Sequence, residues 1–164
     1  MTLSIGSLFA GVGGFDLGLE RAGLGPVLWQ VEIDPFRRAV LAKHWPHVRR
    51  YEDVRAATDL APVDIVCGGF PCSDLSSANP TAQGLAGRRS GLWAEYARIV
   101  GEFSPRIVLV ENVHGAWRRW LPHVRRDLWG LGYSSVPLRV RACEVGALPI
   151  RARVFVVAYP VGSE

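Results

Sequence analysis

The stretch Asp64-Ile65-Val66-Cys67-Gly68-Gly69-Phe70-Pro71-Cys72 is typical of a buried strand that leads into a glycine turn and a cysteine. Residues 65–67 are apolar without alternation, as in a parallel strand covered on both faces. The two glycines permit a sharp turn or a close approach to a ligand, and the proline stiffens the chain before the cysteine. Open α/β sheets bind ligands at the carboxyl ends of their parallel strands, so this pattern predicts a thiol at such a site.

A similar pattern follows about forty residues later, where the apolar run 107–110 leads into Glu111-Asn112-Val113. Two neighbouring strand ends would then offer one nucleophile, Cys72, and one carboxyl group, Glu111. An unpaired carboxylate is costly to bury, which favours a functional role for Glu111. A lone cysteine is more often a small core residue, and we interpret Cys67 and Cys143 in that way.

The composition indicates a globular α/β protein of one domain. A chain of 164 residues with 49% hydrophobic residues can bury a substantial core. Three cysteines without paired spacing argue against a disulfide framework or a zinc site, so we expect no metal and a cytoplasmic location. No signal peptide precedes the first expected strand, and no apolar run is long enough to span a membrane. The net charge of +4 permits DNA binding but does not establish it.

Short strand patterns alternate with helical patterns along the chain. Strands are expected at residues 4–9, 27–31 and 49–51, before Cys72, after Pro105, and at 133–140 and 154–159; helices are expected at 15–22, 35–44, 93–103 and 117–131. This alternation predicts a doubly wound, mostly parallel sheet. The polar loop of residues 73–90 is unusually long for a compact domain, and such loops often act as lids.

The first glycine turn is similar to a dinucleotide fingerprint but departs from it. Gly11 and Gly13 fit the opening of that pattern, whereas Asp16 stands where the third glycine would be. Glu32 ends the second strand and suits the hydroxyls of a ribose. These features indicate an adenosine-containing cofactor without requiring a pyrophosphate. The alternative is a glycine turn that only packs a helix against the sheet.

Taken in order, these motifs resemble those of the DNA cytosine-5 methyltransferases. The resemblance covers nearly the whole chain and implies a Rossmann-like, S-adenosylmethionine-dependent methyltransferase fold. The cofactor-binding positions that it implies are Phe9, Gly11, Gly13, Gly14, Glu32, Ile33, Asp53, Val54, Pro71 and Leu92.

The same resemblance implies the catalytic residues and the substrate. Cys72 would add to C6 of a cytosine flipped out of double-stranded DNA, and Glu111 would hydrogen-bond or protonate N3. Arg153, helped by Arg151, would hold the base oxygen and the carboxylate. The remaining positions implied to contact DNA are Ser76 and Arg89, the second at the end of the loop that the family closes over the base.

Two departures from the family pattern leave alternatives open. Pro149 and Ser73 stand where glutamines are usual. Residues 1–164 resemble a single catalytic, cofactor-binding domain that ends before a target-recognition region. The chain is therefore interpreted as the catalytic part of a split enzyme, with a second subunit or self-association. The alternatives are a truncated, inactive homologue and a nucleotide-binding or interaction domain.

Overall fold

The computed structural model describes residues 2–71 and 91–162. Its strands are β1 (Ile5–Leu8), β2 (Val27–Val31), β3 (Arg49–Tyr51), β4 (Ile65–Gly68), β5 (Ile107–Val113), β6 (Tyr133–Arg141) and β7 (Ala152–Pro160). Its α-helices are α1 (Gly14–Arg21), α2 (Pro35–His44), α3 (Gly91–Phe103) and α4 (Trp117–Gly130). Two short 3₁₀ helices, η2 (His114–Ala116) and η3 (Ala142–Val145), were not anticipated from the sequence.

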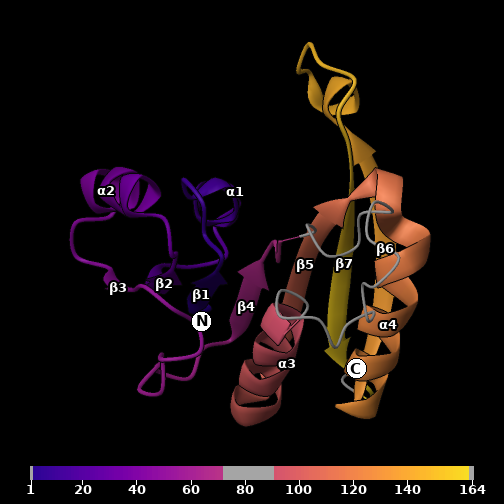
Figure 1. The fold of residues 1–164 in the computed structure, drawn as a ribbon, viewed down its shortest axis with the longest axis horizontal. Helices are drawn as coiled ribbons and strands as arrows, with labels where there is room; N and C mark the ends of the chain where they lie inside the picture. Colours follow the sequence, from indigo (N-terminus) through magenta and orange to yellow (C-terminus); the bar gives the residue numbers. More distant parts are fainter. Residues whose placement is uncertain (1, 72–90, 163–164) are drawn as a thin grey trace.

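The strands form one seven-stranded sheet in the order β3-β2-β1-β4-β5-β7-β6 (Figure 1). The first five strands pair in parallel, and β7 is antiparallel to both β5 and β6. This topology confirms the prediction of a doubly wound, mostly parallel α/β sheet. Because the order reverses between β1 and β4, the carboxyl ends of these strands border the crevice where such sheets bind ligands.

Local sequence signals explain where α1 and α2 begin. Asp34 caps α2 by accepting a 3.1 Å hydrogen bond from the amide of Arg37, and Pro35 occupies the first turn. Helix α1 begins after Gly13, whose φ of 87° lies in the left-handed region. A Cβ at Gly13 would also lie 2.4 Å from the ring of Trp45, so only glycine fits this turn.

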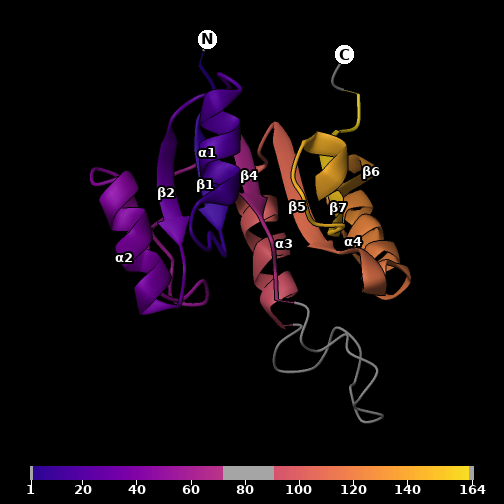
Figure 2. The same cartoon turned by 90° about the horizontal axis from the view of Figure 1, so that it is seen from above.

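Two hydrophobic clusters hold the helices on the sheet. The larger one joins α3 and α4 to the sheet and includes stacked or tilted rings of Phe70, Trp93 and Tyr96. These two helices lie side by side (Figure 2). The smaller cluster packs Leu19 of α1 on β1, β2 and β4 and contains Cys67, as expected for a core cysteine.

The interpretation of Cys143 as a core residue is wrong, because its side chain is exposed. It lies in η3, at the tip of the β6–β7 hairpin, which projects beyond the rest of the sheet (Figure 1). A residue at this tip has no second layer of structure above it among the described residues. Leu148, in the same tip, is 98% exposed.

One face of β6 and β7 carries apolar side chains that the described residues leave partly exposed. Three of them, Val136, Leu138 and Tyr159, are 41–49% exposed. In the antiparallel register Val136 pairs with Val157 and Leu138 with Phe155, which places these side chains next to one another. We call these five residues the open apolar face. Phe155 packs edge-on against Phe15 of α1, so α1 covers one border of this face.

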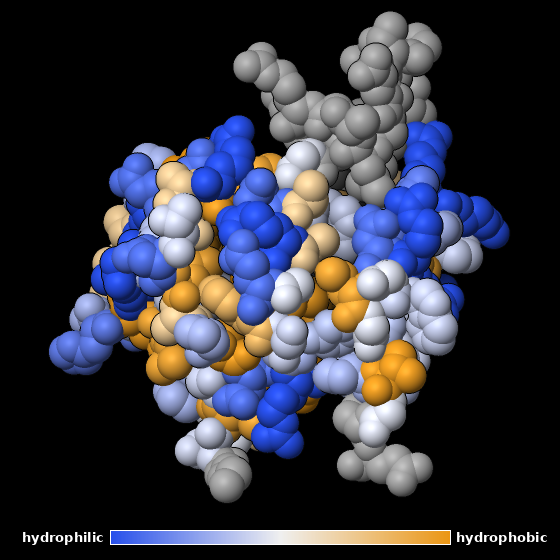
Figure 3. Space-filling model, turned by 90° about the horizontal axis from the view of Figure 1, so that it is seen from below, coloured by the Kyte–Doolittle hydropathy of each residue, from blue (hydrophilic) through white to orange (hydrophobic). Residues whose placement is uncertain are grey.

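Viewed from below, the molecule presents a largely polar surface with several separate apolar areas (Figure 3). No helix within residues 2–71 and 91–162 is long and apolar enough to span a membrane.

Candidate functional site

A pocket of about 280 Å³ opens at the carboxyl edge of the parallel strands. Seven of the expected cofactor-binding residues line it: Phe9, Glu32, Ile33, Asp53, Val54, Pro71 and Leu92. Five further residues line it that were not among the expected site residues: Val31, Arg37, Glu52, Arg55 and Gly69. Of these, Gly69 had been expected only to permit a close approach of the backbone to a ligand. Closeness in the sequence to an expected site residue was the signal that could have identified four of them. These four, which lie within two positions of an expected residue, are Val31, Glu52, Arg55 and Gly69.

Glu32 is held at the pocket by backbone amides. Its Oε2 accepts a 2.7 Å hydrogen bond from the amide of Gly11, and its Oε1 accepts a 3.0 Å bond from that of Asp34. The side chain is only 5% exposed, and a guanidinium nitrogen of Arg37 lies 3.8 Å from Oε1. A carboxylate has about four acceptor positions, so both oxygens can accept further hydrogen bonds from hydroxyl groups.

The glycines of the first turn shape the pocket without lining it. Gly11 has a φ of 61° and contributes the amide that orients Glu32. Gly13 allows Trp45 to pack against the turn, and Gly14 opens α1 with no neighbouring atom within 4 Å of a Cβ. The turn therefore both packs a helix on the sheet and orients an acid in the pocket.

Asp16, which stands in place of a third glycine, is a buried residue outside the pocket. Its carboxylate accepts hydrogen bonds from Ser7 Oγ (2.9 Å) and Gln30 Nε2 (2.8 Å). Burial raises its pKa, and the two hydrogen bonds oppose that shift. Since Ser7 lies in β1 and Gln30 in β2, Asp16 fastens the first turn of α1 to two strands.

Glu111 and Arg153 meet at the junction of β5 and β7. The Glu111 Oε1 atom lies 2.7 Å from Arg153 Nε, and both side chains are about 25% exposed. Burial raises the pKa of Glu111, while the positive charges of Arg153 and Arg151 lower it. Arg151 is itself exposed and acts on this carboxyl group only through its charge.

Gly69 and Asn112 join the end of β4 to the end of β5. A Cβ at Gly69 would lie 2.6 Å from Glu111 Oε2, so glycine lets the carboxylate approach the backbone. The buried Asn112 donates a 3.0 Å hydrogen bond from Nδ2 to the carbonyl of Phe70. Asn112 was not among the expected site residues, although a polar amide at the end of an apolar strand was a signal for it.

Three expected site residues, Cys72, Ser76 and Arg89, lie outside the described residues, as does the loop of residues 73–90. Pro71, next to Cys72 in the chain, lines the pocket. Pro149 lies exposed in the β6–β7 tip. Within the part of the chain that the structure describes, no group of three or more His, Cys, Asp or Glu side chains could hold a metal ion.

Comparisons with known proteins identify the family to which the chain belongs. A family model for C-5 cytosine-specific DNA methylases matches residues 3–164. The chain is 33% identical to the type II methyltransferase M2.BsuMI of Bacillus subtilis, covering 95% of this chain and 42% of the relative. It is 36% identical to the type II methyltransferase M.Eco47II of Escherichia coli, covering 92% of this chain and 38% of the relative. It thus spans about two fifths of the length of these relatives.

A solved structure supports the fold. The Dnmt2 methyltransferase of S. pombe superimposes with a TM-score of 0.81 at 16% sequence identity, covering 99% of this chain and 52% of that one. At this identity the likeness concerns the fold alone, which is the Rossmann-like fold of these methyltransferases. On the family model and the two sequence relatives together, the chain belongs to the family of C-5 cytosine-specific DNA methylases.

Proposed function

We propose that this protein transfers a methyl group from S-adenosylmethionine to C5 of a cytosine flipped out of double-stranded DNA. The position of Gly69 carries the proposal, because this residue lines the pocket and also lies against the carboxylate of Glu111. A cofactor in the pocket and a base at Glu111 would then be neighbours. Family membership supplies the reaction class.

The pocket residues fit the adenosine part of S-adenosylmethionine. Glu32 has spare acceptor capacity for the two ribose hydroxyls, and Asp53 offers acceptors for a purine amino group. Phe9, Ile33 and Val54 supply apolar wall for the flat purine ring. When bound, S-adenosylmethionine supplies the methyl group on a positively charged sulfur.

The chain's own residues would make the cytosine reactive. The thiolate of Cys72 adds to C6 and forms an S–C6 bond, while the electron pair of the C5–C6 double bond becomes available at C5. Glu111 hydrogen-bonds or protonates N3, so negative charge does not build up on the ring. After C5 has gained the methyl group, loss of the C5 proton releases Cys72 and restores the double bond.

Arg153 has two roles in this scheme. It holds the Glu111 carboxylate in place, and its guanidinium presents further donors for the base oxygen. Arg151 would assist through its charge. A raised pKa suits Glu111 to the proton-carrying role, because its protonated form is then populated closer to neutral pH.

We further propose that the active enzyme includes a second polypeptide that covers the open apolar face. The three most exposed side chains of this face lie together on β6 and β7, and contiguous exposed apolar surface commonly marks an interaction site. The occupant expected here is an apolar segment of a subunit that also carries the target-recognition region. Sequence is read by contacts with base edges, and most of the described residues outside the exposed β6–β7 tip belong to the sheet, its helices or the pocket.

Methyl transfer to mixed-sequence DNA tests both proposals. The 164-residue protein is assayed alone and together with the product of a neighbouring reading frame that carries a recognition region. We expect weak transfer alone and strong transfer with the second polypeptide. Leu138→Arg should remove the activation, whereas Leu131→Arg, at a similarly exposed leucine beside α3, should not.

The other outcomes separate the alternatives. Robust, sequence-specific methylation by the isolated monomer would contradict the need for a second polypeptide. S-adenosylmethionine binding in calorimetry, without transfer under any condition, would identify an inactive homologue. No binding of S-adenosylmethionine by any assembly would contradict the proposed function itself.

A further inference from the structure

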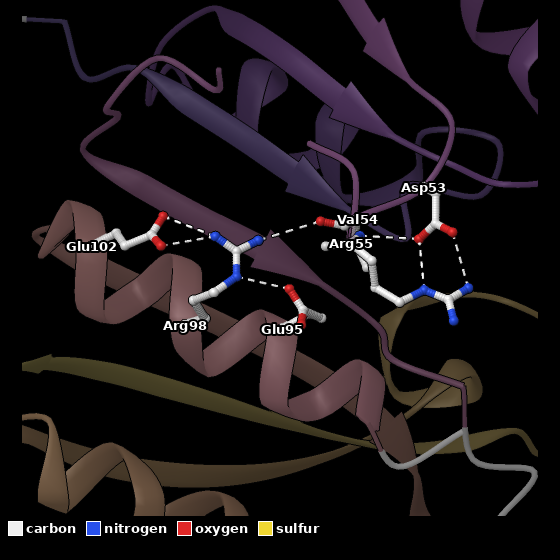
Figure 4. A network of polar contacts seen from close by, with 6 residues as sticks. All are labelled: Asp53, Val54, Arg55, Glu95, Arg98 and Glu102. Atoms are coloured by element: carbon white, nitrogen blue, oxygen red, sulfur yellow. Dashed lines mark hydrogen bonds and ion pairs between the residues drawn. The ribbon is translucent and has the colours of Figure 1, made fainter. Parts of the chain in front are cut away.

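Two arginines fix the segment that carries Asp53, and they do so in different ways (Figure 4). Arg98 of α3 acts on the backbone: its Nη2 donates a 3.4 Å hydrogen bond to the carbonyl of Val54. Glu95 and Glu102 on the same helix hold its guanidinium, with Nε–Oε2 at 2.8 Å and Nη1–Oε1 at 2.9 Å. Arg98 therefore ties the pocket wall at Val54 to α3.

Arg55 acts on the carboxylate of Asp53 in a two-pronged pair. Its Nε lies 3.0 Å from Oδ1 and its Nη2 lies 2.9 Å from Oδ2. The amide of Arg55 also donates to Oδ1 at 3.0 Å. Oδ1 thus accepts two hydrogen bonds and Oδ2 accepts one from Arg55, which leaves acceptor capacity mainly on Oδ2.

The pairing with Arg55 keeps the side chain of Asp53 in its ionised form. Hydrogen bonds from Arg55 lower the pKa of Asp53, so at neutral pH its carboxylate is ionised and only accepts hydrogen bonds. Asp53, Val54 and Arg55 all line the pocket. A fixed carboxylate at this place favours the binding of a purine whose ring carries a hydrogen-bond donor, such as an amino group. It disfavours a purine with a hydrogen atom or a carbonyl oxygen at that position, because neither can donate a hydrogen bond to it.

We propose that Arg55 is a positioning residue that makes Asp53 read the 6-amino group of the cofactor's purine. Arg98 holds the backbone of the same segment and has no part in this selectivity. The inference rests on the proposed function, in which the pocket holds the adenosine part of S-adenosylmethionine.

The exposure of Arg55 makes the proposal testable. The side chain is 59% exposed, and pairs of this kind contribute little to stability, so Arg55→Ala is expected to fold. Arg49 provides a matched control, because it is 62% exposed and pairs with Asp59, which does not line the pocket.

The experiment compares two ligands by calorimetry: S-adenosylmethionine and its analogue with hydrogen in place of the 6-amino group. The wild-type protein should bind S-adenosylmethionine about tenfold more tightly, as expected for one hydrogen bond to a charged acceptor. In Arg55→Ala the ratio of the two affinities should fall to about twofold. Only the affinity for S-adenosylmethionine should decrease, while that for the analogue stays unchanged. Arg49→Ala should keep the wild-type ratio. Arg98→Ala should weaken the binding of both ligands by the same factor and so keep the ratio of their affinities.

Several results would overturn the inference. Arg55 would have only a structural role if Arg55→Ala kept the wild-type ratio of the two affinities. The same would follow if Arg55→Ala lost equal affinity for both ligands. A wild-type protein that binds both ligands equally would show that Asp53 does not read the amino group, while the proposed function would stand. A protein that binds neither ligand in any assembly would contradict the proposed function, and this inference with it.

Discussion

The carboxylate of Glu111 and the guanidinium of Arg153 form a 2.7 Å ion pair between β5 and β7. The two strands are antiparallel neighbours, so the pair spans a single strand-to-strand step. Burial and the arginine charges act on Glu111 in opposite directions, and burial prevails, because the pKa of Glu111 is raised. Arg153 therefore limits how far the acid is driven towards its neutral form.

Replacing Arg153 with methionine should raise the pKa of Glu111 further, because the largest charge that opposes burial is removed. A carbon NMR titration of the Glu111 carboxyl group measures the shift. Arg125→Met is the control, since Arg125 contacts Ser135 and not Glu111. An unchanged midpoint in Arg153→Met would contradict the electrostatic role of the pair.

The raised pKa of Glu111 also sets a direction for stability. The folded state holds this proton to a higher pH than the unfolded state, so the stabilisation is complete below the unfolded pKa. It is lost as the pH rises through the folded pKa. Urea unfolding across that pH range should therefore show a free energy of unfolding that falls less steeply with pH in Glu111→Gln than in the wild-type protein.

Gly69→Ala should impair catalysis more than stability. The new methyl group would lie 2.6 Å from Glu111 Oε2, which is the far end of a side chain that can move away. We expect a stability loss of roughly 1 kcal/mol and a decrease in kcat of about 10- to 100-fold, as for a displacement near 1 Å. Gly115→Ala, where a Cβ meets open space, is the control. Equal kcat values for the two variants would contradict the prediction.

Glu32→Ala should weaken S-adenosylmethionine binding by about 1–3 kcal/mol, the range for leaving buried polar partners unpaired. The substitution also removes the acceptor of the Gly11 and Asp34 amides. Calorimetry measures the change. Glu52→Ala is the matched control, because Glu52 lines the same pocket but is 77% exposed. Similar affinities for the two variants would show that Glu32 does not hold the ribose.

Cys72→Ala should abolish covalent trapping on DNA that contains 5-fluorocytosine, in which C5 carries no proton that can leave. Gel analysis of the denatured protein–DNA adduct in the active assembly measures trapping. Cys143→Ala should trap normally, because Cys143 is exposed at the hairpin tip. Undiminished trapping by Cys72→Ala would show that another residue is the nucleophile.

Local patterns in the sequence were sufficient to predict most of the helices and strands. The strand at Val27–Val31 and the helix at Pro35–His44 have the predicted bounds, because an apolar run and a capped first turn are local signals. The first strand ends at Leu8, one residue earlier than expected, since Phe9 has a positive φ of 53°. This backbone conformation leads into the glycine turn that follows. No local sequence pattern predicts it, so the end of the strand could not be placed from the sequence.

Sequence by itself determined the order of strands and helices and the turn glycines, since each depends on residues close together in the chain. It also determined the family, since several short motifs follow one another in a fixed order along the chain. The family resemblance had already implied that Arg153 holds the carboxylate of Glu111, and the structure gave this contact its geometry. Only the tertiary structure decided that Asn112 donates to the carbonyl of Phe70 and that Arg55 pairs with Asp53. It also placed Cys143 at an exposed tip. The physical reason is that pairing and burial depend on strand register and on which layers cover a residue, and distant parts of the chain set both.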